Sequence, residues 1–232
     1  MTATILTPPR RLKVFVQGKV VIPDWVDDLD SFCRWRVSGD APEQGELAFL
    51  DTGIWVDLSM EEFPAHNQVK AAFDFAIMSV VQPASLGRYV PDRMLLKNAT
   101  ANLSAEPDGL FFAWETMRSG RLRLVEKPGQ GFMELEGTPD LVLEVVSKTS
   151  VEKDNVLLRE LYWKAGIAEY WLVDARDGKL SFEILRLTPD GYAATAAMEG
   201  WVSSNVLGNK FQVQQKIDPL GHPQFFVVWA ET

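Results

Sequence analysis

An apolar stretch with one acid near its middle constrains this chain more than any other feature. Residues 139–147 read Pro-Asp-Leu-Val-Leu-Glu-Val-Val-Ser, and five of the six residues from Leu141 to Val146 are apolar. A short, β-rich apolar run is typical of a strand that is covered on both faces. An ionised carboxylate in a dry core costs several kcal/mol unless a cation or hydrogen bonds compensate it. Glu144 therefore indicates either a structural ion pair or a carboxylate that binds metal or transfers protons.

The rest of the composition is that of an ordinary globular protein. The 232 residues are 47% hydrophobic and 24% charged, enough apolar material for a substantial core. Cys33 is the single cysteine, so a disulfide framework and a cysteine-based zinc site are excluded, and a reducing cytoplasm is expected. No apolar run approaches the roughly 20 residues that span a bilayer, and the N-terminus lacks the apolar segment of a secretory signal. We expect no membrane association.

The net charge of −9 bears on the possible partners. Neutralisation of phosphates by basic side chains supplies much of the affinity of proteins that coat nucleic acid, so this charge argues against such a protein. It does not argue against a nuclease, because bound divalent cations cancel the local charge of carboxylates.

Apolar residues at a period near 3.6 predict two main helices. The first runs from about residue 65 to 81 and ends before Pro83, and the second runs from about 149 to 164 and ends before Gly166. Two capping boxes are predicted ahead of them, Ser59 with Glu62 and Thr149 with Glu152. A shorter amphipathic helix is expected within residues 24–36.

The strands predicted around these helices suggest one α/β domain. They are a hairpin over 46–58, a strand after Asp108, the stretch 139–147, its partners 169–173 and 180–187, and a closing edge strand at 225–229. The strand, helix and strand over 141–173 form a βαβ unit, whose two strands run parallel. We expect an N-terminal extension with a short helix over residues 1–44 and a single domain over 45–232.

Two acids occupy positions that suit chemistry at one end of this sheet. Asp108 follows Pro107 at the start of one apolar strand, and Glu144 lies within the other. If the two strands are neighbours, the carboxylates converge, because side chains alternate between the faces of a strand. Paired carboxylates suit Mg²⁺ or Mn²⁺, which prefer oxygen ligands. Such an ion can activate water and stabilise charge on a phosphate.

Three motifs carry a resemblance to a known family. They are Glu106-Pro107-Asp108-Gly109, the stretch Pro139–Ser147, and Tyr162-Trp163-Lys164-Ala165-Gly166-Ile167-Ala168-Glu169-Tyr170-Trp171-Leu172-Val173-Asp174. The chain resembles the Uma-type restriction-endonuclease-like proteins of bacteria, within the PD-(D/E)XK nuclease superfamily, closely over residues 104–187 and more loosely over 45–103. The resemblance implies an α/β fold with a restriction-endonuclease-like core, a mixed central β-sheet flanked by helices, often in a dimer.

The resemblance also implies roles for particular residues. Asp108 and Glu144 would bind the catalytic Mg²⁺ or Mn²⁺. The superfamily's lysine would stand at Val146, and the family's alternative helix position aligns with Leu158, so both positions depart from the pattern. The remaining candidates are Lys148 on the face of Glu144 if the strand continues, Arg159 beside Leu158, Lys153 further up the helix, and Glu46 for an upstream acid that aligns near Ala48. Asp140 is expected to cap the strand start, and His66 to be either a base or a solvated helix end.

These observations predict a metal-dependent endonuclease that hydrolyses phosphodiester bonds in DNA, as a cytoplasmic homodimer. Val146, Leu158 and the net charge of −9 also fit an alternative, a nuclease-derived binding or assembly module without enzymatic activity. A hydrolase of a smaller phosphate ester is a third possibility, which suits an acidic surface.

Overall fold

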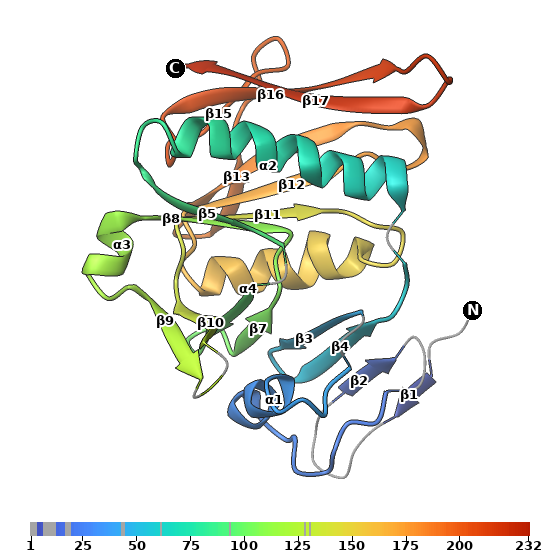
Figure 1. Cartoon of the computed structure of the whole chain (residues 1–232), viewed down its shortest axis with the longest axis vertical. Helices are drawn as coiled ribbons and strands as arrows, with labels where there is room; N and C mark the ends of the chain where they lie inside the picture. Colours follow the sequence, from blue (N-terminus) through green and yellow to red (C-terminus); the bar gives the residue numbers. More distant parts are fainter. Residues whose placement is uncertain are drawn as a thin grey trace.

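The computed structural model describes residues 4–6, 13–16, 20–42, 45–60, 62–92, 94–127, 129 and 131–232. These residues form three β-sheets with helices between and beside them (Figure 1). The helical segments are α1 (Leu29–Arg36), η1 (Phe63–Asn67), α2 (Gln68–Val81), α3 (Trp114–Arg118), η2 (Lys153–Leu158), α4 (Arg159–Lys164) and η3 (Arg176–Gly178). None of the helices described is long and apolar enough to cross a membrane.

The central sheet is mixed and lies between two helices. In spatial order its strands are β14 (Gly191–Ala194), β13 (Ser181–Thr188), β12 (Glu169–Asp174), β11 (Leu141–Val145), β8 (Gly109–Ala113) and β5 (Gly87–Pro91). Only β11 and β12 pair in parallel, as the predicted βαβ unit requires. Figure 1 shows α2 on one side of this sheet and α4 on the other. The predicted mixed sheet flanked by helices is confirmed.

The strand β11 is buried on both faces, as its sequence predicts. Leu141, Leu143 and Val145 pack in the core beneath α2, whereas Val142 packs in the core beneath α4. Glu144 shares the face of Val142, because alternate residues of a strand point to the same side, and it is only 2% exposed. The adjacency of β8 and β11 that the sequence analysis required is also present.

A second, eight-stranded sheet lies beside the first. Its order is β1 (Thr4–Leu6), β2 (Lys13–Val16), β4 (Gly53–Asp57), β3 (Glu46–Leu50), β7 (Leu103–Ala105), β6 (Leu95–Asn98), β10 (Gly131–Gly137) and β9 (Leu122–Lys127). The predicted hairpin is β3 and β4. Phe32 and Trp35 of α1 are fully buried and pack in one cluster with Leu47 and Phe49 of β3. The boundary expected at residue 44 stays a prediction.

The C-terminal residues form a third sheet that the sequence analysis reduced to one edge strand. Its strands are β15 (Val202–Ser203), β16 (Asn209–Ile217) and β17 (Pro223–Glu231), and they lie over α2 (Figure 1). The carboxylate of Glu169, on β12, anchors the segment before β16, because it accepts hydrogen bonds from the Ser204 hydroxyl at 2.7 Å and the Asn205 amide at 2.6 Å. Glu169 is 1% exposed, so these donors compensate the burial of its polar side chain.

Both predicted capping boxes are wrong. The helical segment after β4 begins after Glu62 without a side-chain cap, and the Ser59 amide donates instead to Asp57 Oδ1 at 2.8 Å. Before η2, the reciprocal bonds join Ser147 and Ser150, at 2.9 and 3.0 Å. Thr149 donates its hydroxyl proton to Asp57 Oδ2 at 2.5 Å. Asp57 therefore accepts hydrogen bonds from both residues that the sequence predicted as helix caps, from the amide of Ser59 and from the hydroxyl of Thr149.

Candidate active site

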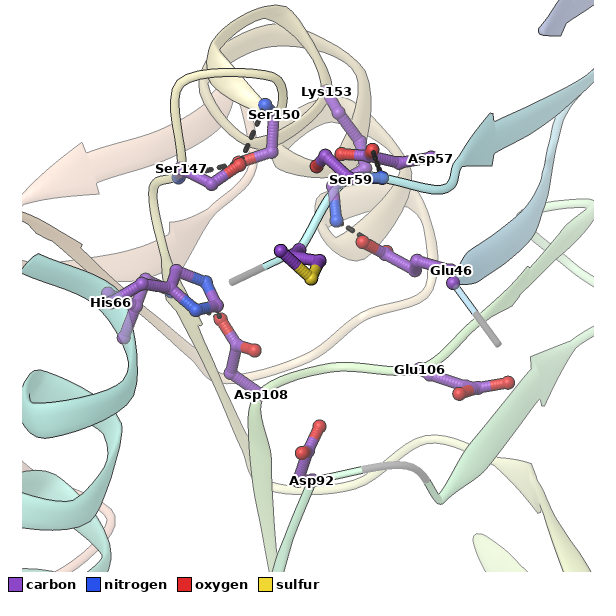
Figure 2. Close-up of a pocket in the computed structure, with 13 residues that line it drawn as sticks. Glu46, Asp57, Ser59, His66, Asp92, Glu106, Asp108, Ser147, Ser150 and Lys153 are labelled. Atoms are coloured by element: carbon purple, nitrogen blue, oxygen red, sulfur yellow. Dashed lines mark hydrogen bonds and ion pairs between the residues drawn. The ribbon is translucent and has the colours of Figure 1, made fainter. Parts of the chain in front are cut away.

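An acidic pocket of about 290 Å³ opens where β8, β11 and β3 meet η1 and η2. We use this name for the cavity lined by Glu46, Asp57, Asp92, Glu106, Asp108, His66 and Lys153, among others. Figure 2 shows His66 and Asp108 pointing toward each other on one side, and Glu46 pointing toward Lys153 on the other. Two of these side chains come from π-helical turns, since His66 lies in η1 and Lys153 in η2; such turns are frequent at functional sites.

Asp108 is held at the start of β8 by contacts from three directions. Its Oδ2 accepts the Val145 amide of β11 at 2.7 Å, and its Oδ1 lies 3.0 Å from Lys70 Nζ of α2. The His66 Nε2 atom lies 3.6 Å from Oδ2. Gly109 is required here, because a Cβ at this position would come within 2.0 Å of the Tyr89 hydroxyl. The carboxylate of Asp108 is thus fixed at the end of two neighbouring strands.

Glu144 is the buried acid of the site. Its Oε1 accepts a hydrogen bond of 2.6 Å from the Tyr162 hydroxyl of α4. Burial raises the pKa of Glu144 well above the usual range of a carboxyl group, since Lys153 only partly offsets the loss of solvent and Asp154 and Asp108 add negative potential. A cation beside Glu144 would stabilise its ionised form.

Lys153, named from the sequence as a candidate further up the helix, is the cation that reaches the pocket. Its Nζ lies 2.5 Å from Glu46 Oε1 and 3.3 Å from Asp154 Oδ1, and its side chain is 3% exposed. Burial disfavours its charged form, but Asp154, Glu46 and Glu144 outweigh this effect and raise the pKa of Lys153 well above its usual value. Lys153 is therefore an ammonium group enclosed by acids. A π-helical turn changes the direction in which successive side chains point, so the aligned position at Leu158 did not reveal it.

The other two candidate cations, Lys148 and Arg159, lie elsewhere. The strand β11 ends at Val145, so Lys148 does not continue the face of Glu144, and it pairs instead with Glu62 at 3.3 Å. Arg159 donates to the carbonyl oxygen of Tyr192 at 3.3 Å. Neither side chain lines the acidic pocket.

Asp140 has bonding partners that suit its predicted place at the strand start. Its Oδ2 accepts the Ala113 amide at 2.7 Å and the Thr116 hydroxyl at 2.6 Å, and its Oδ1 pairs with Arg121. These contacts tie the start of β11 to α3. His66, by contrast, is 8% exposed and faces the pocket, so it is no solvated helix end.

The pocket's donor set suits a hard divalent cation. Asp108 and Glu46 line the pocket and offer carboxylate oxygens, the ligands that Mg²⁺ and Mn²⁺ prefer. Glu144 is not among the lining residues, but its raised pKa shows that its carboxyl group lies where little positive charge compensates its burial. Within the described ranges, no three side chains of His, Cys, Asp or Glu already converge as a metal-ligand group. The ammonium groups of Lys153 and Lys70 lie against Glu46 and Asp108 there.

Comparisons with known proteins identify the family and the fold of this chain. A family model described as "Uma2: Putative restriction endonuclease" matches residues 29–214. The fold is similar to a solved structure whose title is "Crystal structure of a putative nuclease belonging to DUF820 from Anabaena variabilis ATCC 29413". The TM-score is 0.52 and the identity 18%, over 78% of this chain and 90% of that chain; at this identity the similarity shows the fold alone. No functionally curated protein matches the chain.

Proposed function

This chain belongs to the family described as "Uma2: Putative restriction endonuclease", and we propose that it is a metal-dependent hydrolase that cleaves phosphodiester bonds in DNA. One observation carries the proposal: Asp108 and Glu46 line one pocket together with the buried ammonium of Lys153, and the charges of all three act on the buried carboxyl group of Glu144. Acids of this kind beside a lysine suit hydrolysis of a charged ester.

In the proposed mechanism, Asp108, Glu144 and Glu46 would hold Mg²⁺ or Mn²⁺. When bound, such an ion lowers the pKa of a water molecule and stabilises charge on the phosphate. The Lys153 ammonium would stabilise the negative charge that develops on the phosphate oxygens. The Val145 amide and the Tyr162 hydroxyl orient Asp108 and Glu144 through their hydrogen bonds.

The position of Lys153 beside Glu46 also bears on the alternative, a nuclease-derived module without activity. The main argument for that module rested on Val146 and Leu158, which occupy the positions where a lysine was expected. Because Lys153 reaches the acids from η2, neither position has to supply the cation. The homodimer expected from the family resemblance stays a prediction.

The decisive experiment compares isosteric variants of the full chain. Asp108→Asn and Glu144→Gln each replace a carboxyl group with an amide of the same size, and Asp190→Asn does the same in an exposed turn. We expect the wild type and Asp190→Asn to nick plasmid DNA with Mg²⁺ or Mn²⁺ and to bind Mn²⁺ in calorimetry. Asp108→Asn and Glu144→Gln should lose about 100-fold or more in cleavage rate and bind Mn²⁺ more weakly.

Two outcomes count against the proposal. A folded wild type that neither binds Mn²⁺ nor cuts DNA with any divalent ion favours the inactive module. Cleavage of bis(p-nitrophenyl) phosphate without cleavage of DNA assigns the pocket to a smaller ester instead.

A further inference from the structure

The third sheet ends in a long strand with one uncovered edge. Among the residues that the structure describes, β17 pairs only with β16, so its other edge has no partner strand. Its register with β16 is continuous from Pro223 to Glu231, and the residues from Phe225 to Trp229 are all apolar. A long, regular and apolar edge offers a row of backbone donors and acceptors to another strand.

Folded proteins usually protect such edges, and the usual devices are missing between the ends of β17. No charged residue occurs from Gln224 to Ala230, and no register shift interrupts the pairing of β17 with β16. Lysines, inward charges and bulges are the common means of blocking edge pairing. Between its two ends the strand therefore lacks these blocking features, and Pro223 and Glu231 occupy the ends themselves.

An exposed aromatic ring lies beside the same strand. Phe75 of α2 is 65% exposed, and its ring centroid lies 6.1 Å from that of Trp229. The Phe226 ring, on the outer face of β17, is 37% exposed. Helix α2 lies directly under β17 (Figure 1). The uncovered strand and Phe75 thus make one apolar surface, which we call the β17 edge.

We propose that the β17 edge binds a second copy of this chain, with the two β17 strands antiparallel about a twofold axis at Val227. This pairing joins two three-stranded sheets into one of six strands. It also brings the two copies of Phe75 toward the seam, where water is excluded from them. The inference is independent of the proposed hydrolysis.

The sequence of β17 is self-complementary in an antiparallel pairing. About an axis at Val227, Phe225 faces Trp229 of the second copy, and Phe226 faces Val228 of the second copy. Pairs of aromatic and β-branched residues are favourable across antiparallel strands. No like charges oppose each other along the run, because Glu231 faces Pro223 of the second copy. A twofold interface needs this kind of self-complementary patch.

The first test measures the mass of the full chain by light scattering during size-exclusion chromatography. We expect the wild type to have twice the monomer mass. Phe75→Glu places a charge at an exposed helix position, and Val228→Lys places one on the edge strand, so each should raise the dissociation constant by about 100-fold or more. Met198→Glu is the matched control, because Met198 is 77% exposed in the turn before β15 and should leave the dimer intact. Far-UV circular dichroism verifies that each variant is folded.

A second test reports the register directly. Directly opposed residues of antiparallel strands have Cα atoms about 4.5–5.5 Å apart, within the range that a disulfide spans. Val227→Cys should therefore give a covalent dimer on mild oxidation, whereas the wild type, whose Cys33 is buried, should not. A monomeric wild type overturns the proposal. So does a dimer that persists in both Phe75→Glu and Val228→Lys, or a Val227→Cys dimer that does not crosslink.

Discussion

Lys153 Nζ lies 2.5 Å from Glu46 Oε1, so the helix that follows β11 is tied to a strand 107 residues earlier in the chain. This ion pair places a cation beside the acids of the pocket although Val146 occupies the usual position on the strand. The pair is largely buried, with 3% exposure at Lys153 and 29% at Glu46. Breaking such a pair leaves a charge without its partner, which costs more than loss of a surface ion pair.

We predict that Lys153→Met lowers the rate of DNA cleavage by about 100-fold or more, because it removes the buried positive charge beside Glu46. Lys148→Met is the matched control. Lys148 is 65% exposed and pairs with Glu62 outside the pocket, so its loss should change the rate less than about twofold. Cleavage assays on folded protein compare the two. Equal losses in both variants would contradict the assignment of Lys153.

Tyr162→Phe should destabilise the protein by about 2 kcal/mol, because it removes the 2.6 Å hydrogen bond to Glu144 and leaves a buried carboxyl group short of a donor. Tyr170→Phe is the comparison. The Tyr170 hydroxyl donates to the backbone carbonyl of Asp154 at 2.9 Å, and loss of that neutral bond should cost about 1 kcal/mol. Urea unfolding of both variants measures the difference, and a larger loss at Tyr170 would refute this ranking.

Asp74 makes stability depend on pH. Burial raises the pKa of Asp74 from 3.8 to about 6, although a hydrogen bond from Tyr89 opposes the shift. Between these values the folded protein keeps a proton that the unfolded chain has released, so stability falls as pH rises through this window and stays lower above it. For a fully buried group, a shift of this size would lower the free energy of unfolding above about pH 6 by about 3 kcal/mol. Because Asp74 is partly exposed, we expect a loss of about 1 kcal/mol.

Asp74→Asn removes this effect and keeps an acceptor for Tyr89. We expect the variant to be about 1 kcal/mol more stable than the wild type at about pH 7 and equally stable at about pH 4. Urea unfolding at the two pH values measures both. A difference that is the same at both would rule out titration of Asp74 as its cause.

Asp140→Ala should lower the stability of the protein without lowering its cleavage rate, because Asp140 supports the strand start whereas Asp108, in the other Pro-Asp motif, belongs to the proposed active site. The Ala113 amide and the Thr116 hydroxyl both lose their acceptor, so the free energy of unfolding should fall by about 1–3 kcal/mol. The cleavage rate of the folded fraction should stay within about twofold of the wild type, unlike that of Asp108→Asn. A large loss of cleavage by fully folded Asp140→Ala would mean that Asp140 also contributes to the site.

Much of the central sheet was predictable because its signals are local. The run Leu141–Val146 identifies a strand buried on both faces, and the helix and strand that follow it identify a parallel pair. Asp108 was found because a Pro-Asp motif before an apolar strand places an acid at a sheet end. The C-terminal sheet was largely missed, since the half-buried strands β16 and β17 mix polar and apolar residues and owe their position to α2 beneath them.

The amino-acid sequence alone indicated that this chain has an acid within an apolar central strand, and that Asp108 stands at the start of another apolar strand. Only the tertiary structure showed that these two strands are neighbours. It also decided which cation meets these acids. Lys153 rather than Lys148 or Arg159 reaches the pocket, because β11 ends at Val145 and a π-helical turn follows. Likewise Asp57, distant in sequence, takes the hydrogen bonds of the predicted cap residue Thr149. Such choices depend on groups far apart in the chain, and local patterns do not record them.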